Sequence, residues 1–188
     1  LLSFSDALTQ TQIRLDTMND GLQTTAQLSD MIFASAQRSR GAYQDTANAV
    51  SQLGMLAGSA FESSQEIVAF AEQMNKQMAL SGASAGDAQA AIQQITESMA
   101  SGALGGEELS AILRRAPSIA DALAGYMGVG ADSLQEMASE GKITADVMKN
   151  ALFAAADETN QRFAAMPATW SQVWTMVQNI ITQALEPV

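Results

Sequence analysis

Apolar residues recur along much of this chain at intervals of three and four positions, the spacing of one face of an α-helix. The clearest block runs from Gly102 to Leu152, where four short helical patterns follow one another and each is closed by glycine or proline. Alternating apolar and polar residues with β-branched enrichment, the mark of a half-buried strand, are not found. The pattern predicts an all-α protein, a bundle of about eight short helices with helical extensions at both ends.

The four helices of this block carry start and stop signals. Glu107 and Glu108 fall in a first turn, where the positive end of the helix dipole favours anions. Pro117 suits a first turn because the N–H that it lacks would be unpaired there anyway. Gly141 can take the positive φ of a C′ residue, and Thr144 can cap the fourth helix. Eight positions form the structural signature of the block: Gly106, Glu107, Glu108, Leu109, Pro117, Gly128, Gly141 and Thr144.

Two further expectations concern the later helices of the block. Asp132 and Gln135 have the spacing of a capping box, which would make Asp132 the N-cap of the third helix. The fourth helix is expected to continue to about Ala165, where Pro167 then breaks the chain.

The N-terminal residues show a short heptad-like seam with spacings of four and three. Its positions are Phe4, Leu8, Thr11, Leu15, Met18 and Leu22. One interpretation is a coiled-coil arm that joins copies of the chain, and the other is an amphipathic helix docked on its own domain. About three repeats with a threonine in the seam do not separate the two.

A final helix is predicted after Thr169, and it contains both tryptophans of the chain. We take four residues of its broad apolar face as the candidate interaction surface: Trp170, Trp174, Val177 and Ile181. The simpler interpretation is that this helix packs on the protein's own domain. The alternative is an exposed partner surface, because tryptophan is enriched at the energetic centres of interfaces.

These patterns divide the chain into three parts. Residues 1 to 42 would form N-terminal amphipathic helices and the candidate coiled-coil arm. Residues 43 to 166 would form a compact helical domain. Residues 168 to 188 would form a C-terminal amphipathic helix that leads into the rest of a longer chain. Neither an initiator methionine nor a signal-peptide pattern is present at Leu1, which indicates a fragment of something longer.

The amino-acid composition excludes several kinds of catalytic and metal-binding site. Histidine and cysteine are both absent, which excludes Ser–His and Cys–His catalytic pairs, His or Cys metal sites and disulfides. Adjacent carboxylates such as Asp157 and Glu158 point to different sides of a helix and form no acid–base pair. We therefore expect no catalytic residue, no cofactor site and no metal site.

The charge balance argues against nucleic acid as a partner. The chain has 9 Lys and Arg against 20 Asp and Glu, a formal charge of −11, which repels phosphate backbones. Residues 119 to 141 imitate a helix-turn-helix, but the second helix carries Asp132, Glu136 and Glu140 and no basic residue. We expect no binding to duplex DNA. A run of about 18 apolar residues, which a membrane span needs, is also missing.

Residues 104 to 153, LGGEELSAILRRAPSIADALAGYMGVGADSLQEMASEGKITADVMKNALF, resemble the signature block of phage tail tape measure proteins. In that family a G-E-E/D-L helix, an A-P helix, an L-G-V turn and an E-G-K-I-T-A-D helix follow in this order. Four further blocks share the resemblance: FASAQRSRGAY (33 to 43), LGMLAGSAF (53 to 61), EIVAFAEQMNKQM (66 to 78) and FAAMPATWSQVW (163 to 174).

The resemblance implies a structural protein of a phage or prophage tail, represented here by a domain from the N-terminal region. It implies a role in tail length determination and assembly, and later in genome delivery. The implied location is the lumen of the tail tube in the virion, and the host cytoplasm during assembly. The implied partners are other copies of the chain, the tail tube protein, tail assembly chaperones and tail-tip proteins. The alternative is a stand-alone helical interaction module or adaptor that uses the helix of Trp170 to bind a partner.

Overall fold

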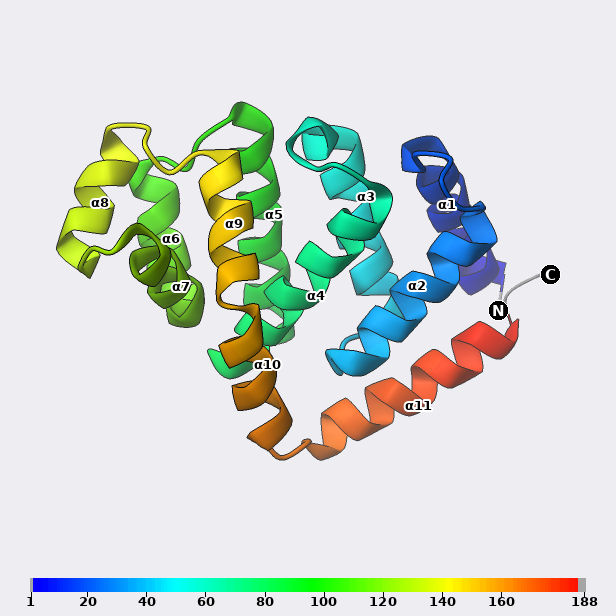
Figure 1. Cartoon of the computed structure of the whole chain (residues 1–188). Helices are drawn as coiled ribbons and strands as arrows, with labels where there is room; N and C mark the ends of the chain where they lie inside the picture. The colour runs from blue at the N-terminus through cyan, green and yellow to red at the C-terminus, as the bar shows by residue number, and fades with distance from the viewer. Residues whose placement is uncertain (1, 186–188) are drawn as a thin grey trace. The chain divides into compact units, whose positions relative to one another are not determined.

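The computed structural model describes residues 2 to 185, and within this range the fold is entirely helical, as predicted (Figure 1). The elements are α1 (Leu2–Met18), α2 (Thr25–Arg38), α3 (Tyr43–Ala57), the 3-10 helix η1 (Gly58–Ala60), α4 (Ser64–Leu80), α5 (Ala85–Ser101), α6 (Gly106–Arg115), α7 (Pro117–Met127), α8 (Ala131–Ser139), α9 (Ala145–Ala154), α10 (Ala156–Ala165) and α11 (Trp170–Leu185). Among the described residues the only β-type pairing is an isolated antiparallel bridge between Ala103 and Thr144.

The described part of the chain thus holds eleven α-helices, more than the expected number of about eight. One cause is that the helix expected to reach Ala165 is two helices, α9 and α10, which meet at Ala155. Each of them buries its own inward residues, Leu152 in α9 and Phe163 in α10. Neither glycine nor proline marks this break.

The chain forms two compact units, Leu1–Glu72 with Pro167–Val188, and Gln73–Met166. The boundary falls within α4, whereas the sequence pattern placed a domain start at residue 43. The difference has a physical cause in the first unit, where α3 packs against both α1 and α2. Residues 43 to 57 therefore belong with the N-terminal helices rather than with the block that contains Pro117.

In the first unit, α1 docks on its own chain. Leu8, Thr11 and Leu15 of the heptad-like seam are buried, and α1 packs on α3 and α2. The contact with α3 is close at Gly54, where an added Cβ would lie 2.9 Å from Cβ of Met18. These contacts favour the docked amphipathic helix over an arm that joins copies. Leu22, the last seam position, lies beyond the end of α1 and is exposed.

In the second unit, the helices of the block from Gly102 to Leu152 pack on one another, with α7 against α6, α8 and α9. Two backbone hydrogen bonds beside the Ala103–Thr144 bridge connect the segment before α6 with the segment before α9. Leu104 N–H donates to Ile143 O at 2.8 Å, and Ala145 N–H donates to Gly102 O at 3.1 Å. The core includes several leucines and isoleucines that are almost completely buried: Leu104, Leu109, Ile112, Ile119 and Leu123.

Most predicted helix ends are confirmed. Pro117 is the first residue of α7, and Gly128 ends that helix in the left-handed region with a φ of 67°. Thr144 caps α9 by accepting the N–H of Val147. The expected capping box at Asp132 is wrong, because α8 begins after Gly130 and has no side-chain cap.

Gly141 follows α8 with a φ of 71°, so its replacement by alanine tests the predicted C′ position. No atom lies within 4 Å of an added Cβ, so the expected loss of about 1–2 kcal/mol comes from the backbone alone. Urea unfolding would measure it. Gly125→Ala in α7 is the matched control, because Cβ meets open space there too and alanine favours a helix by about 1 kcal/mol. Equal effects of the two substitutions would contradict the assignment.

Candidate interaction surface

The candidate surface lies on α11, which begins at a complete capping box. Thr169 Oγ1 accepts the N–H of Gln172 at 3.1 Å, and Gln172 Oε1 accepts the N–H of Thr169 at 3.0 Å. The two side chains satisfy two of the otherwise unpaired groups at the start of the helix. The sequence signal at Thr169 is therefore confirmed, and α11 has a defined starting direction.

α11 packs on α2 (Figure 1). The face that packs is the polar one. Its only buried residue among those described is Asn179. The other positions turned toward the protein are partly exposed and follow the same face of the helix: Gln172, Thr175, Met176 and Thr182. α11 thus does pack on its own domain, as the simpler interpretation has it, but through its polar face.

Asn179 is the residue that holds α11 in place. Its Oδ1 accepts the backbone N–H of Tyr43 at 2.8 Å, and its Nδ2 donates to Gly41 O at 2.7 Å and to Gln37 Oε1 at 3.0 Å. Gln37 Nε2 in turn donates to Met176 O at 3.3 Å. Because Ala42, the N-cap of α3, offers no side-chain cap, Asn179 supplies the acceptor that the first turn of α3 lacks.

The apolar face of α11 is turned away from the first unit. Trp170 is 89% exposed, Trp174 60%, Val177 39% and Ile181 51%. Val173, Ile180 and Leu185 are exposed as well. The structure therefore brings the four predicted residues together on one exposed strip, although it does not show what they bind.

The outward strip is also free of charge. From Trp170 to Leu185 the helix contains no Asp, Glu, Lys or Arg, in a chain whose formal charge is −11. Large contiguous apolar patches are rare on the surfaces of monomeric proteins, and those that occur often mark interaction sites.

The signature residues of the second unit hold its helices together. Gly106 starts α6 where α8 passes so closely that an added Cβ would lie 2.9 Å from Ser139 Oγ. Gln135 of α8 donates from Nε2 to Gly106 O at 2.7 Å and accepts from Ser110 Oγ at 3.2 Å. Gln135 therefore bridges α6 and α8 instead of completing a capping box with Asp132.

The remaining signature positions have local roles. Glu107 and Glu108 lie in the first turn of α6, as expected, and Leu109 is fully buried. Together with the residues already described at the helix ends, these positions account for packing and helix termination.

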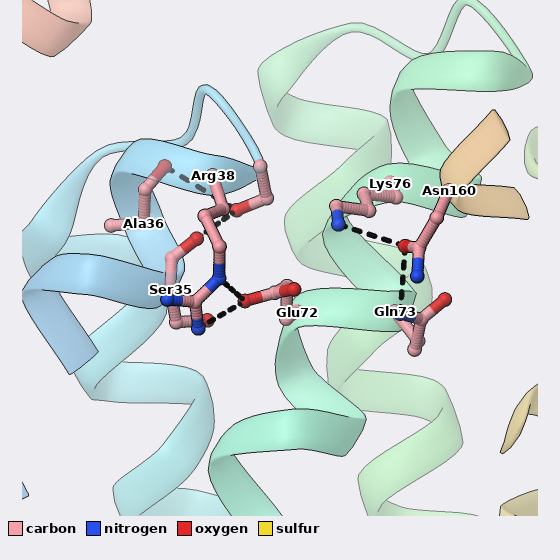
Figure 2. Close-up of polar contacts among 8 residues, drawn as sticks. Ser35, Ala36, Arg38, Glu72, Gln73, Lys76 and Asn160 are labelled. Carbon is pink, nitrogen blue, oxygen red and sulfur yellow. Dashed lines mark hydrogen bonds and ion pairs between the residues drawn. The ribbon is translucent and has the colours of Figure 1, made fainter. Parts of the chain in front are cut away.

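A buried polar seam between α4 and α10 of the second unit was not predicted. Lys76 and Gln73 are each only 6% exposed, and both donate to Oδ1 of Asn160, at 2.8 and 3.2 Å (Figure 2). The Lys76 ammonium also lies 5.7 Å from the centre of the Phe163 ring, a cation–π distance. Polar residues at positions 73, 76 and 77 have the spacing of a solvated helix face, so no sequence signal indicated their burial.

Figure 2 also shows an ion pair within the first unit. Arg38 Nη2 lies 2.7 Å from Glu72 Oε1, and Arg38 Nε donates to the same oxygen at 2.8 Å. Because the arginine side chain is 58% exposed, this pair contributes at most about 1 kcal/mol.

Asp20 caps the start of α4 in the first unit. Its Oδ2 accepts the N–H of Ser64 at 2.8 Å, and its own N–H donates to Ser64 Oγ at 3.0 Å. The hydrogen bonds from the backbone N–H groups of Ser64 and Leu22 lower the pKa of Asp20 below its usual value. Asp20 therefore acts as an additional cap for α4, beside Ser63, which accepts the N–H of Glu66.

Replacement of Asp20 by alanine should make the protein less stable at neutral pH, by about 1 kcal/mol for a lost cap. A lowered folded-state pKa stabilises above the ordinary value of about 3.9, and this stabilisation disappears as the pH falls below it. The difference between wild type and variant should therefore shrink between neutral and strongly acidic pH in urea unfolding. Asp121→Ala, at an exposed position of α7, is the control. A pH-independent difference would contradict this role of the carboxylate.

Residues 2 to 185 contain neither a metal-binding cluster nor a helix suited to span a membrane. This part of the chain contains no cluster of three or more acidic residues arranged to hold a metal ion. None of its helices has the length and apolar character that crossing a membrane requires.

Comparison with protein families identifies the chain. The family model described as "Tape measure protein" matches residues 1–188, and the chain belongs to the tape measure protein family. The family is structural and acts in the determination of phage tail length. Comparison with curated proteins and with solved structures gives no match.

Proposed function

We propose that these residues form a folded module of a tape measure protein, and that the ruler that sets tail length lies in chain outside them. The module would act during tail assembly by binding other tail components. The proposed partners are the tail tube protein, tail assembly chaperones, tail-tip proteins and other copies of the chain. The proposed location is the lumen of the tail tube, after assembly in the host cytoplasm, with a later part in genome delivery.

One observation carries this proposal, the hydrogen bonds of Asn179 with Gly41 and Tyr43. Asn179 lies 2.7 Å from Gly41 O although 138 positions separate the two residues in the sequence. In a continuous helix with a rise of 1.5 Å per residue, they would be roughly 200 Å apart. A segment whose stability depends on such a contact is folded back on itself, which is the opposite of what a ruler needs.

The helix lengths support the same conclusion. The longest helices of the described residues have 17 residues, which corresponds to about 25 Å each. Caps and glycines with positive φ end them, including Gly82, Gly102 and Gly128. These ends are built to stop helices, whereas an extended ruler would need helices that continue.

Deletion of the second unit, Gln73–Met166, from the full-length protein tests the proposal. If this unit were stretched out as ruler, tails would shorten by about 140 Å at the helical rise. We expect fewer tails or poorly infectious ones, with the surviving tails at wild-type length in electron micrographs. The control is an equal deletion from the long helical part of the full-length protein, which should shorten the tails. Tails shortened by both deletions would overturn the proposal.

A further inference from the structure

We propose that the outward face of α11 is the surface through which two copies of this chain pair, helix against helix. The inference rests on the proposed function, since it names one partner of the module. The face comprises the four residues of the candidate surface together with Val173, Ile180 and Ala184. Two features determine which partner it fits, namely the spacing of its residues and the absence of charge.

The spacing is that of a coiled-coil seam. Counted from Trp170, the residues 173, 177, 180 and 184 follow at intervals of three, four, three and four. This places Trp170, Val177 and Ala184 at one core position of the heptad and Val173 and Ile180 at the other. Trp174 and Ile181 widen the stripe on one side. A surface with this repeat fits another helix better than it fits a flat surface or an extended strand.

The absence of charge allows a second copy to be the partner helix. Charged residues beside a coiled-coil seam normally set partner choice, and α11 has none. Two chains of formal charge −11 repel one another at most surfaces, but not across an uncharged strip. A two-fold arrangement needs only one self-complementary surface, which this face supplies.

The same features argue against a lipid surface. Helices that lie on membranes have Lys and Arg on the polar face, where they meet anionic headgroups. The polar face of α11 contains neither, and it is already occupied by the contacts of Asn179 with Gln37 and Gly41.

The two exposed tryptophans alone supply a large share of the area that pairing needs. An aromatic side chain can bury about 150–250 Å², so the two exposed indoles would contribute roughly 300 Å². This is more than a third of the about 800 Å² that each partner buries in a standard interface, before the five aliphatic residues are counted. The hydrogen bonds of Asn179 fix the orientation of α11 beforehand, so its helix need not be ordered on pairing.

Sedimentation equilibrium and tryptophan fluorescence of the 188-residue chain test the inference. We expect a mass of twice 19.7 kDa at micromolar concentrations, and a blue shift of the emission as the concentration rises. The fluorescence is specific for α11 because Trp170 and Trp174 are the only tryptophans of the chain. A chain that stays monomeric, with emission typical of water-exposed tryptophan throughout, would overturn the inference.

Two variants locate the interface. Ile181→Glu and Val177→Glu should each weaken pairing at least roughly 100-fold, because a carboxylate would be buried without a partner. Both positions are exposed, so the circular dichroism melting curve of the monomer should not change. The control is Leu56→Glu on α3, where the wild-type residue is 57% exposed and the added charge should leave pairing unchanged.

The remaining outcomes separate other partners from a second copy. Pairing that persists in both α11 variants would overturn the inference, because it would place the interface elsewhere. A blue shift only on addition of vesicles of zwitterionic phosphatidylcholine, without a change in protein mass, would overturn the inference and assign the face to lipid. Failure of pairing would leave the tail-length result of the deletion unaffected, so the two proposals can fail separately.

Discussion

Replacement of Asn179 by alanine is expected to destabilise the first unit by about 3 kcal/mol. The side chain is 3% exposed and serves three partners at once. Its loss removes these bonds from the buried N–H of Tyr43 and from the half-buried C=O of Gly41, and removing the partner of such a group costs about 1–3 kcal/mol. The cost is larger than for an ordinary cap because the acceptor also holds a second helix, α11, in place.

Urea unfolding followed by circular dichroism would measure this loss, and hydrogen exchange would show where it acts. The amides of α11 should exchange much faster in the variant, because the helix loses its main attachment to α2 and α3. Gln178→Ala, at the neighbouring exposed position of the same helix, is the control and should change stability by less than about 0.5 kcal/mol. Similar stability of the two variants would show that other contacts hold α11.

The helix ends could be predicted well because their causes are local. A cap or a C′ glycine depends on groups within four residues, so Thr144, Pro117 and Gly141 were identified from spacing alone. The wrong prediction of a capping box at Asp132 has a different cause. Asp132 had the spacing of a cap, but Gly130 already occupies that position, and Gln135 instead bonds to Gly106, 29 residues away.

The orientation of α11 could not be predicted from its pattern. A helical repeat shows that two faces differ, and burial of the apolar face is the usual outcome. Here the polar face of α11 packs on α2, because Asn179 forms hydrogen bonds with Gln37, Gly41 and Tyr43. These residues lie more than a hundred positions earlier in the sequence. The heptad-like pattern of α1 likewise did not distinguish a coiled-coil arm from a helix docked on its own domain. The close contact between Met18 and Gly54 favours docking within the chain.

The second prediction with a large effect concerns Gln77, which joins three helices of the second unit. Gln77 is 2% exposed, and its Nε2 donates to Thr159 Oγ1 of α10 at 2.9 Å. Its Oε1 accepts a hydrogen bond from Ser118 Oγ of α7. Gln77→Met keeps the volume but removes both bonds and leaves two hydroxyl groups buried. We expect a loss of about 2–4 kcal/mol.

A triple variant separates the contribution of the hydrogen bonds to stability from the contribution of side-chain packing. Methionine at 77 combined with Ser118→Ala and Thr159→Val removes the two hydroxyl groups that Gln77→Met leaves unpaired. Because an apolar replacement of all partners is often nearly neutral, the triple variant should regain most of the stability lost in the single variant. Gln65→Met, at an exposed position of α4, is the control for methionine in this helix. A triple variant as unstable as Gln77→Met in urea unfolding would mean that glutamine stabilises the seam through its packing, and that its hydrogen bonds with Ser118 and Thr159 contribute little.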